Sequence, residues 1–186
     1  MESTLISTRV ENMNLQEQLA AAMQGTVVVM GIGNPCRGDD AAGSLVARKI
    51  SDVPGVHVID AQDVPENYLC QVAEQRPDTV VLIDSVDLKS APGSVAFLDK
   101  DQTAAYWPST HRVPISLLMN YLERETHTRV LLIAIQPRQT AFLQPMSAAV
   151  SSSVEAIAGV LKEVIAVRQM PAQTGFTSRL SSKEPS

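Results

Sequence analysis

Cysteine, aromatic residues and long apolar runs are all scarce in this sequence, and each scarcity excludes a class of protein. The two cysteines, Cys36 and Cys70, form no Cys-x-x-Cys pair, which excludes a disulfide framework or cysteine-rich zinc module and favours a reducing, cytoplasmic compartment. The longest apolar runs, such as 130–135, fall far short of the ~18 residues of a membrane helix. The first residues also lack the basic and then apolar stretches of a secretory signal. We therefore expect a cytoplasmic protein with no membrane segment.

Basic residues are also in the minority. The chain has 15 Lys and Arg against 20 Asp and Glu, for a net charge of −5, so it lacks the basic surface that nucleic-acid binding usually needs. Apolar residues make up 45% and charged residues 19%, which is typical of a globular protein. A chain of 186 residues is long enough for one domain and too short for two of ordinary size.

The sequence predicts one domain between two polar ends. Residues 1–24 are a polar leader that either contains a short helix, Leu15 to Met23, or stays loose. Residues 25–169 are expected to form a single α/β domain. Residues 170–186 are rich in Ser, Gln and Pro, have no apolar period, and are predicted to be a disordered tail.

Strand and helix patterns alternate through the central segment. Apolar or β-branched runs predict five strands, at 26–30, 56–59, 79–83, 94–98 and 130–135. Helical spacing predicts helices over 40–50 and from Pro65, Pro114 and Ser147. This alternation, with strands that are apolar throughout, is typical of a mainly parallel sheet covered by helices on both faces. Ligands of such sheets bind outside the carboxyl ends of the strands.

The loop after the first predicted strand, residues 31–40, is glycine-rich but does not fit a nucleotide site. A dinucleotide fingerprint needs glycine or alanine where Cys36 stands. Gly33 and Gly38 have the spacing of a phosphate-binding loop, but aspartates occupy the next two positions, where a Lys and a Ser or Thr belong. Two carboxylates there would repel a phosphate, so the loop favours a cation.

The two aspartates of this loop have different expected roles. Asp39 is interpreted mainly as a cap of the following helix, where an acidic residue gains ~0.3–1 kcal/mol from the helix dipole. One acidic residue is enough for a cap, so Asp40 needs a second explanation.

Two further polar residues follow predicted strands on the same side of the sheet. Asp84 closes the third strand and by itself could be only a turn former, and His111 precedes a predicted helix. The other histidines, His57 and His127, are interpreted as structural. With Asp40, these residues supply two oxygen donors and one imidazole from three separate connections. Such a set can hold a divalent transition metal and leave coordination positions open.

Other catalytic patterns are missing or weak. The sequence has no His-Glu-x-x-His helix and no Gly-x-Ser-x-Gly elbow, which argues against a thermolysin-like peptidase and a serine hydrolase. Cys36 and His111 could pair as nucleophile and base. However, the neighbouring Asp39 and Asp40 disfavour a thiolate, which makes cysteine catalysis a weak alternative.

Four motifs cover about residues 26–165 and read Val-Met-Gly-Ile-Gly-Asn-Pro-Cys-Arg-Gly-Asp-Asp-Ala-Ala-Gly (29–43), Val-Leu-Ile-Asp-Ser-Val-Asp (81–87), Ser-Thr-His-Arg-Val-Pro (109–114) and Ile-Gln-Pro (135–137). In series they resemble the hydrogenase maturation endopeptidases, and Pro-Glu-Asn (65–67) with Arg76-Pro77 resembles most closely the branch that processes the formate-hydrogenlyase hydrogenase. Each motif is weak alone, but the four in order and at suitable spacing are fairly specific. The leader, the tail and Cys36 are not family features.

The resemblance implies an activity and a fold. Members of the family clip a C-terminal extension from the precursor of the [NiFe]-hydrogenase large subunit after nickel has been inserted. They are three-layer αβα sandwiches, usually monomeric. The nickel is expected to arrive with the precursor rather than to stay in the enzyme, and a precursor without metal would lose binding energy at the site.

The resemblance also assigns site residues. The nickel-contacting residues of the family carry over to Asp40, Asp84 and His111, and the two aspartates are the catalytic candidates. Residues expected to bind the substrate are Gly33, Asn34 and Asp39. Either nickel polarises the scissile carbonyl or activates water, or one aspartate acts as general base.

Two other functions remain open on the same scaffold. One is a non-catalytic chaperone that binds nickel or the precursor without cleaving it. The other is an enzyme that handles nucleosides or phosphate and uses the 33–38 loop.

Overall fold

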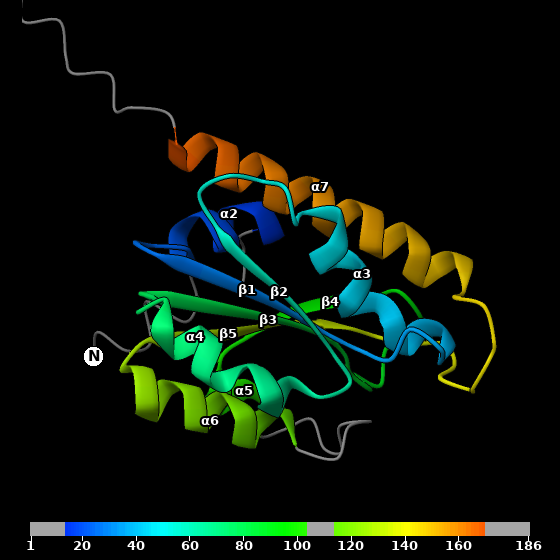
Figure 1. The fold of residues 1–186 in the computed structure, drawn as a ribbon. Coiled ribbons are helices and arrows are strands. Elements are labelled where there is room, and N and C mark those ends of the chain that lie inside the picture. Colours follow the sequence, from blue (N-terminus) through cyan, green and yellow to red (C-terminus); the bar gives the residue numbers. More distant parts are fainter. Residues whose placement is uncertain (1–13, 104–113, 170–186) are drawn as a thin grey trace, which may run out of the picture.

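The computed structural model describes residues 14–103 and 114–169, which contain a five-stranded sheet with helices on both faces (Figure 1). The strand order is β2-β1-β3-β5-β4. The pairs β1–β2, β1–β3 and β3–β5 are parallel, and β4 runs antiparallel to β5. The predicted α/β class and mainly parallel five-stranded sheet are therefore confirmed. The strands are β1 (Val27–Ile32), β2 (His57–Gln62), β3 (Thr79–Ser85), β4 (Val95–Leu98) and β5 (Arg129–Ile135).

The helices form a layer on each side of the sheet (Figure 1). One layer holds α2 (Leu15–Ala22), α3 (Ala42–Lys49) and α7 (Ala148–Gln169), and the other holds α4 (Leu69–Glu74), α5 (Lys100–Thr103) and α6 (Ile115–Thr126). Two short 3-10 helices, η1 (Gly38–Ala41) and η2 (Pro65–Tyr68), lead into α3 and α4. No helix in the described part of the chain is both long enough and apolar enough to span a bilayer.

The side chains on the two faces of the sheet pack into two separate hydrophobic cores. In β1, Val27 and Val29 pack in the core under α2, α3 and α7, whereas Val28 and Met30 pack in the core under α4 and α6. Successive strand residues point to opposite faces, so a strand covered on both sides needs an unbroken apolar run. This is why the central strands were predictable from apolar runs alone.

Helix α2 belongs to the folded unit. The side chain of Asn14 accepts a hydrogen bond from the Glu17 N–H, and the side chain of Glu17 accepts one from the Asn14 N–H, which forms a capping box. Leu19 and Met23 are fully buried against α7 and its neighbours. The short helix expected in the leader is present, and the packed structure thus begins ahead of residue 25. Residues 1–13 and the tail, 170–186, lie outside the described residues.

Candidate functional site

Two of the polar residues predicted for the site, Asp40 and Asp84, lie at the carboxyl ends of β1 and β3. Gly31 of β1 pairs with Ile83 of β3, and the first turn of α3 lies directly on both strand ends. A Cβ on Gly43, in that turn, would come within 2.0 Å of the Ile83 carbonyl oxygen and 2.4 Å of the Ile32 carbonyl oxygen. Asp40 precedes this turn and Asp84 follows Ile83. The fold therefore brings both aspartates to one edge of the sheet.

Asp40 is buried, with 2% of its surface exposed, and the preceding loop is shaped around it. Its carboxylate accepts a hydrogen bond from the Asn34 N–H (3.2 Å). Gly33 has a φ of +143°, and a Cβ there would lie 1.9 Å from the Asp40 carbonyl oxygen. Only glycine fits this close approach of two backbone segments. Gly33 and Asn34 thus fix the position of Asp40.

The side chain of Asn34 joins the loop to the end of β2. Its Oδ1 accepts the Cys36 N–H (2.9 Å), which closes a local turn, and its Nδ2 donates to the Asp63 carboxylate (2.8 Å). These contacts within the chain explain why asparagine suits this position. The expected contact of Gly33 and Asn34 with substrate stays a prediction.

Asp84 lies inside a strand, not in a turn. It is fully buried and pairs in register with Ala134, and β3 continues to Ser85. Its Oδ1 accepts the Ser85 N–H at 2.7 Å. The alternative that Asp84 only forms a turn does not fit this position in β3. A buried ionisable group on a central strand is costly, because its charge loses the solvation of water.

The third member of the predicted trio, His111, lies outside the described residues, which resume at Pro114 just before α6. Within residues 14–103 and 114–169, no three His, Cys, Asp or Glu side chains gather closely enough to hold a metal ion. The structure thus places two of the three predicted nickel-contacting residues, Asp40 and Asp84, at the same end of the sheet, and the trio stays a prediction.

Asp39 has a different role from the predicted one. Neither η1 nor α3 has a side-chain cap, so the expected capping of the following helix is wrong. The fully buried carboxylate instead accepts hydrogen bonds from the Ser147 N–H (2.6 Å), the Ser147 hydroxyl (2.9 Å), the Arg138 N–H (2.8 Å) and the Gln139 N–H (3.2 Å). It therefore fastens the connection from β5 to α7 against η1. Its predicted contact with substrate is untested.

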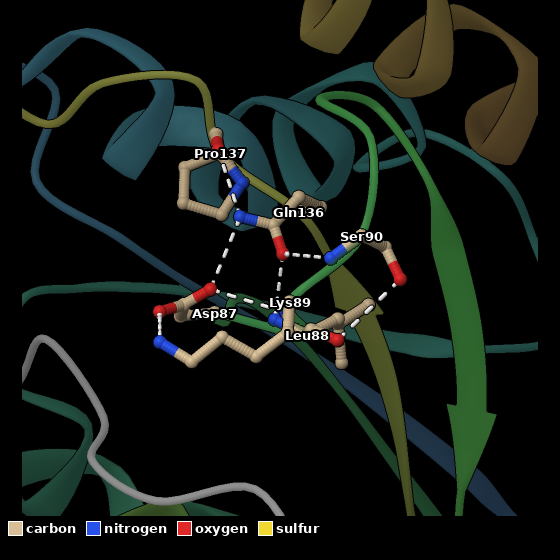
Figure 2. A network of polar contacts seen from close by, with 6 residues as sticks. All are labelled: Asp87, Leu88, Lys89, Ser90, Gln136 and Pro137. Carbon is tan, nitrogen blue, oxygen red and sulfur yellow. Dashed lines mark hydrogen bonds and ion pairs between the residues drawn. The ribbon is translucent and has the colours of Figure 1, made fainter.

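Gln136, which sequence reasoning noted only as part of the Ile-Gln-Pro motif, organises the segment after β3 (Figure 2). Its Oε1 accepts the N–H groups of Leu88 (2.7 Å) and Ser90 (3.3 Å). Its Nε2 donates to the Asp87 carboxylate (3.4 Å) and to the Pro137 carbonyl oxygen (3.0 Å). The side chain is buried, and both the oxygen and the nitrogen of its amide group form hydrogen bonds. It ties the chain that leaves Asp84 to the end of β5.

Charge at the rim of the site is partly compensated. Lys89 forms an ion pair with the Asp87 carboxylate. The hydrogen bond from the Lys89 side chain, with a second from its backbone N–H, lowers the pKa of Asp87 below its usual value near 3.8. Asp87 therefore stays ionised at neutral pH, and the ammonium group of Lys89 compensates its charge.

A cavity of about 430 Å³ lies at the opposite end of the sheet. Residues 73, 76–78 and 125–129 line it, at the amino ends of β3 and β5. Arg76 and Arg129 there are balanced by Asp78 and Glu125, so the cavity has no strong preference for a charged ligand. It does not contain the predicted site residues.

Comparisons with known proteins agree with the observed fold and show the family. The hydrogenase maturation protease family (HycI) matches residues 42–164. The hydrogenase 3 maturation protease of Escherichia coli K12 is 33% identical over 135 residues, which cover 71% of this chain and 86% of that protein. The crystal structure of the [NiFe] hydrogenase maturation protease HycI from Thermococcus kodakarensis KOD1 is 29% identical, with a TM-score of 0.73, over 80% of this chain and 99% of that one. The solution structure of the endopeptidase HycI from Escherichia coli is 31% identical, with a TM-score of 0.68, over 75% of this chain and 90% of that one. The match in sequence and in fold means that this chain belongs to the hydrogenase maturation protease family.

Proposed function

We propose that this protease removes the C-terminal extension from the precursor of a [NiFe]-hydrogenase large subunit after nickel insertion. The observation that carries the proposal is the placement of two buried carboxylates, Asp40 and Asp84, at one sheet edge in a chain of the maturation protease family. The edge is where an α/β sheet binds its ligand. The precursor is the substrate, and nickel is its cargo.

The carboxylates recognise the loaded precursor through its metal. Two buried carboxylates at one edge repel each other, and a divalent cation that binds between them relieves the repulsion. His111 adds an imidazole donor, and the cysteines of the precursor complete the coordination. A precursor without nickel lacks these contacts and binds more weakly.

Hydrolysis needs a nucleophilic water at the scissile peptide bond. One aspartate carboxylate, as in an aspartyl-type protease, takes the proton from this water as general base. The competing route uses nickel to polarise the carbonyl or to activate the water. Asparagine separates the two roles, because it keeps an oxygen donor for the metal but is no base.

The test compares processing of nickel-loaded and metal-free precursor by the wild type and by Asp40→Asn, Asp84→Asn and His111→Ala. Mass spectrometry of the large subunit measures the loss of the extension. We expect each variant to process the loaded precursor at least about 100-fold more slowly, the usual size of a lost acid–base group. His57→Ala and His127→Ala are the controls and should process normally.

Near-normal processing by all three variants would remove this assignment of the site. A wild-type chain that binds the loaded precursor but never shortens it would be a chaperone on the same scaffold. If Asp40→Asn or Asp84→Asn still binds the loaded precursor but does not cleave it, that aspartate is the general base.

The proposal includes a monomer that acts in the cytoplasm without a nucleic-acid partner. Both cysteines, Cys36 and Cys70, are free and exposed, which suits a reducing compartment. The net charge of −5 disfavours binding to nucleic acid. Light scattering of the purified chain measures the oligomeric state.

A further inference from the structure

The connection between β5 and α7 forms a loop, residues 138–147, whose two ends are held by one side chain. Arg138 and Gln139 at its start and Ser147 at its end all donate to the buried Asp39 carboxylate. Asp39 also donates its own N–H to the Gln139 carbonyl oxygen (3.1 Å). The loop is therefore closed at its base against η1, the 3-10 helix that contains Asp40.

The middle of this 138–147 loop is also braced. The Gln139 side chain donates to the Pro145 carbonyl oxygen (2.9 Å) and accepts the Ala141 N–H (3.1 Å). The Leu143 N–H donates to the Cys36 carbonyl oxygen (2.7 Å), which joins the tip of the loop to the 33–37 turn beside Asp40. The tip thus has a defined position next to the candidate site.

The tip presents two adjacent large apolar side chains to solvent. Phe142 is 63% exposed and Leu143 is 74% exposed. Leu143 also has a φ of +58°, a left-handed conformation that a leucine rarely adopts. Backbone strain of this kind persists only where surrounding contacts impose it, and it clusters at functional sites. The braced loop thus holds two apolar side chains in solvent next to the candidate site.

We infer that Phe142 and Leu143 form a docking tip for the hydrogenase large-subunit precursor, seated in an apolar patch of that protein. The inference rests on the proposed function. A protein substrate must cover the edge that contains Asp40 and Asp84 in order to be cleaved, and the tip is hydrogen-bonded to the loop at that edge. Apolar anchors that are pre-organised lose little entropy on binding, so they add affinity efficiently.

The test measures the Kd for nickel-loaded precursor, and KM and kcat where cleavage occurs, for Phe142→Ser and Leu143→Gly. We expect Kd and KM to rise by about tenfold in each, which is 1.4 kcal/mol, with kcat within about twofold of wild type. Leu143→Gly separates docking from folding, because glycine tolerates the positive φ and should leave the melting temperature unchanged or higher.

The matched controls remove exposed apolar side chains elsewhere. They are Val167→Ser on α7, where the valine is 66% exposed, and Leu117→Ser on α6, where the leucine is 57% exposed. Both should leave Kd, KM and kcat unchanged.

Unchanged Kd and KM in both tip variants would overturn the docking inference while leaving the proposed cleavage intact. Conversely, a wild type that binds but does not cleave would contradict the proposed function, and a raised Kd in the tip variants would still support docking. Self-association of the wild type that Phe142→Ser abolishes, with precursor binding unaffected, would show that a second copy occupies the tip and would also overturn the inference.

Discussion

Asp39 and Asp40 are neighbours in the chain and both are buried, yet their carboxylates contact different parts of the molecule. They lie in the 3-10 helix η1, which has three residues per turn, so consecutive side chains point about 120° apart. Asp39 faces the 138–147 loop and accepts four hydrogen bonds there, while Asp40 faces the 33–37 turn. The pair therefore combines an anchoring carboxylate with a candidate catalytic one.

Replacement of Asp39 by Asn should loosen the 138–147 loop. One carboxylate oxygen becomes an NH₂ group, which cannot accept, so at least one donor of Arg138, Gln139 or Ser147 loses its partner. Each buried donor left unpaired costs about 1–3 kcal/mol. We expect a lower free energy of unfolding in urea and a raised KM for the precursor. Asp52→Asn, at an exposed carboxylate that accepts a hydrogen bond from the Ser51 hydroxyl, should change neither quantity. Equal stability of the two variants would contradict the anchoring role.

At the scale of elements, the contact of α3 with the ends of β1 and β3 places Asp40. Three glycines make this contact. Gly31 and Gly43 lie face to face, and a Cβ on Gly31 would come within 2.1 Å of the Gly43 carbonyl oxygen. Gly33 allows the chain to turn back under Asp40. Side chains at these positions would push α3 and η1 away from the sheet.

The change Gly43→Ala tests this contact. Helix propensity alone predicts that alanine stabilises the protein, whereas the contact predicts that it destabilises the protein. Alanine normally stabilises a helix by about 1 kcal/mol relative to glycine. Here the added methyl meets the backbone carbonyls of Ile83 and Ile32, which have little freedom to move. We expect a loss of about 1–3 kcal/mol of unfolding free energy and slower processing.

Gly159→Ala in α7 is the matched control for Gly43→Ala. Nothing lies within 4 Å of its added Cβ, so the variant should be more stable than wild type and equally active. Similar denaturation curves for the two variants would show that the contact of α3 with the strand ends is looser than described.

At the scale of the whole molecule, two helical layers enclose the sheet (Figure 1). Segments that are far apart in the sequence form the candidate site at the carboxyl ends of its strands. The 33–40 segment, the end of β3 and the 136–147 connection all meet there. Helix α2 packs beside α7, and Gln24, which follows it, donates its N–H to the Thr79 hydroxyl at the opposite, amino end of β3. The N-terminal helix thus supports the scaffold and not the chemistry.

Leu19→Ala should therefore reduce stability and leave the catalytic parameters unchanged. Leu19 is fully buried in the core under α2, α3 and α7, and such truncations cost about 2–5 kcal/mol. Thermal unfolding followed by circular dichroism measures the loss, and processing is assayed well below the melting temperature. Gln16→Ala, at an exposed position of the same helix, should stay within about 0.5 kcal/mol of wild type. A stable Leu19→Ala protein would mean that α2 is dispensable.

Much of the fold was predictable because strands buried on both faces need unbroken apolar runs. The apolar or β-branched runs at 26–30, 79–83 and 130–135 correspond to β1, β3 and β5. The direction of β4 was not predictable, since it depends on hydrogen bonds to β5 across a long connection. The position of Asp40 and Asp84 at one edge was predictable because they follow strands whose carboxyl ends share that edge. Gln136 was missed because a single glutamine after a strand gives no signal of the amide and carboxylate partners that it meets.

By itself the sequence determined the α/β class, the five strands, the helices other than the short α5 and, through motifs in series, the family, because these depend on local periodicity and on residue types at short spacing. Only the tertiary structure decided that Asp39 anchors Ser147, 108 residues away, and that Phe142 and Leu143 stand beside the site. Hydrogen bonds and exposure at such separations depend on which segments pack together, and no local pattern encodes that.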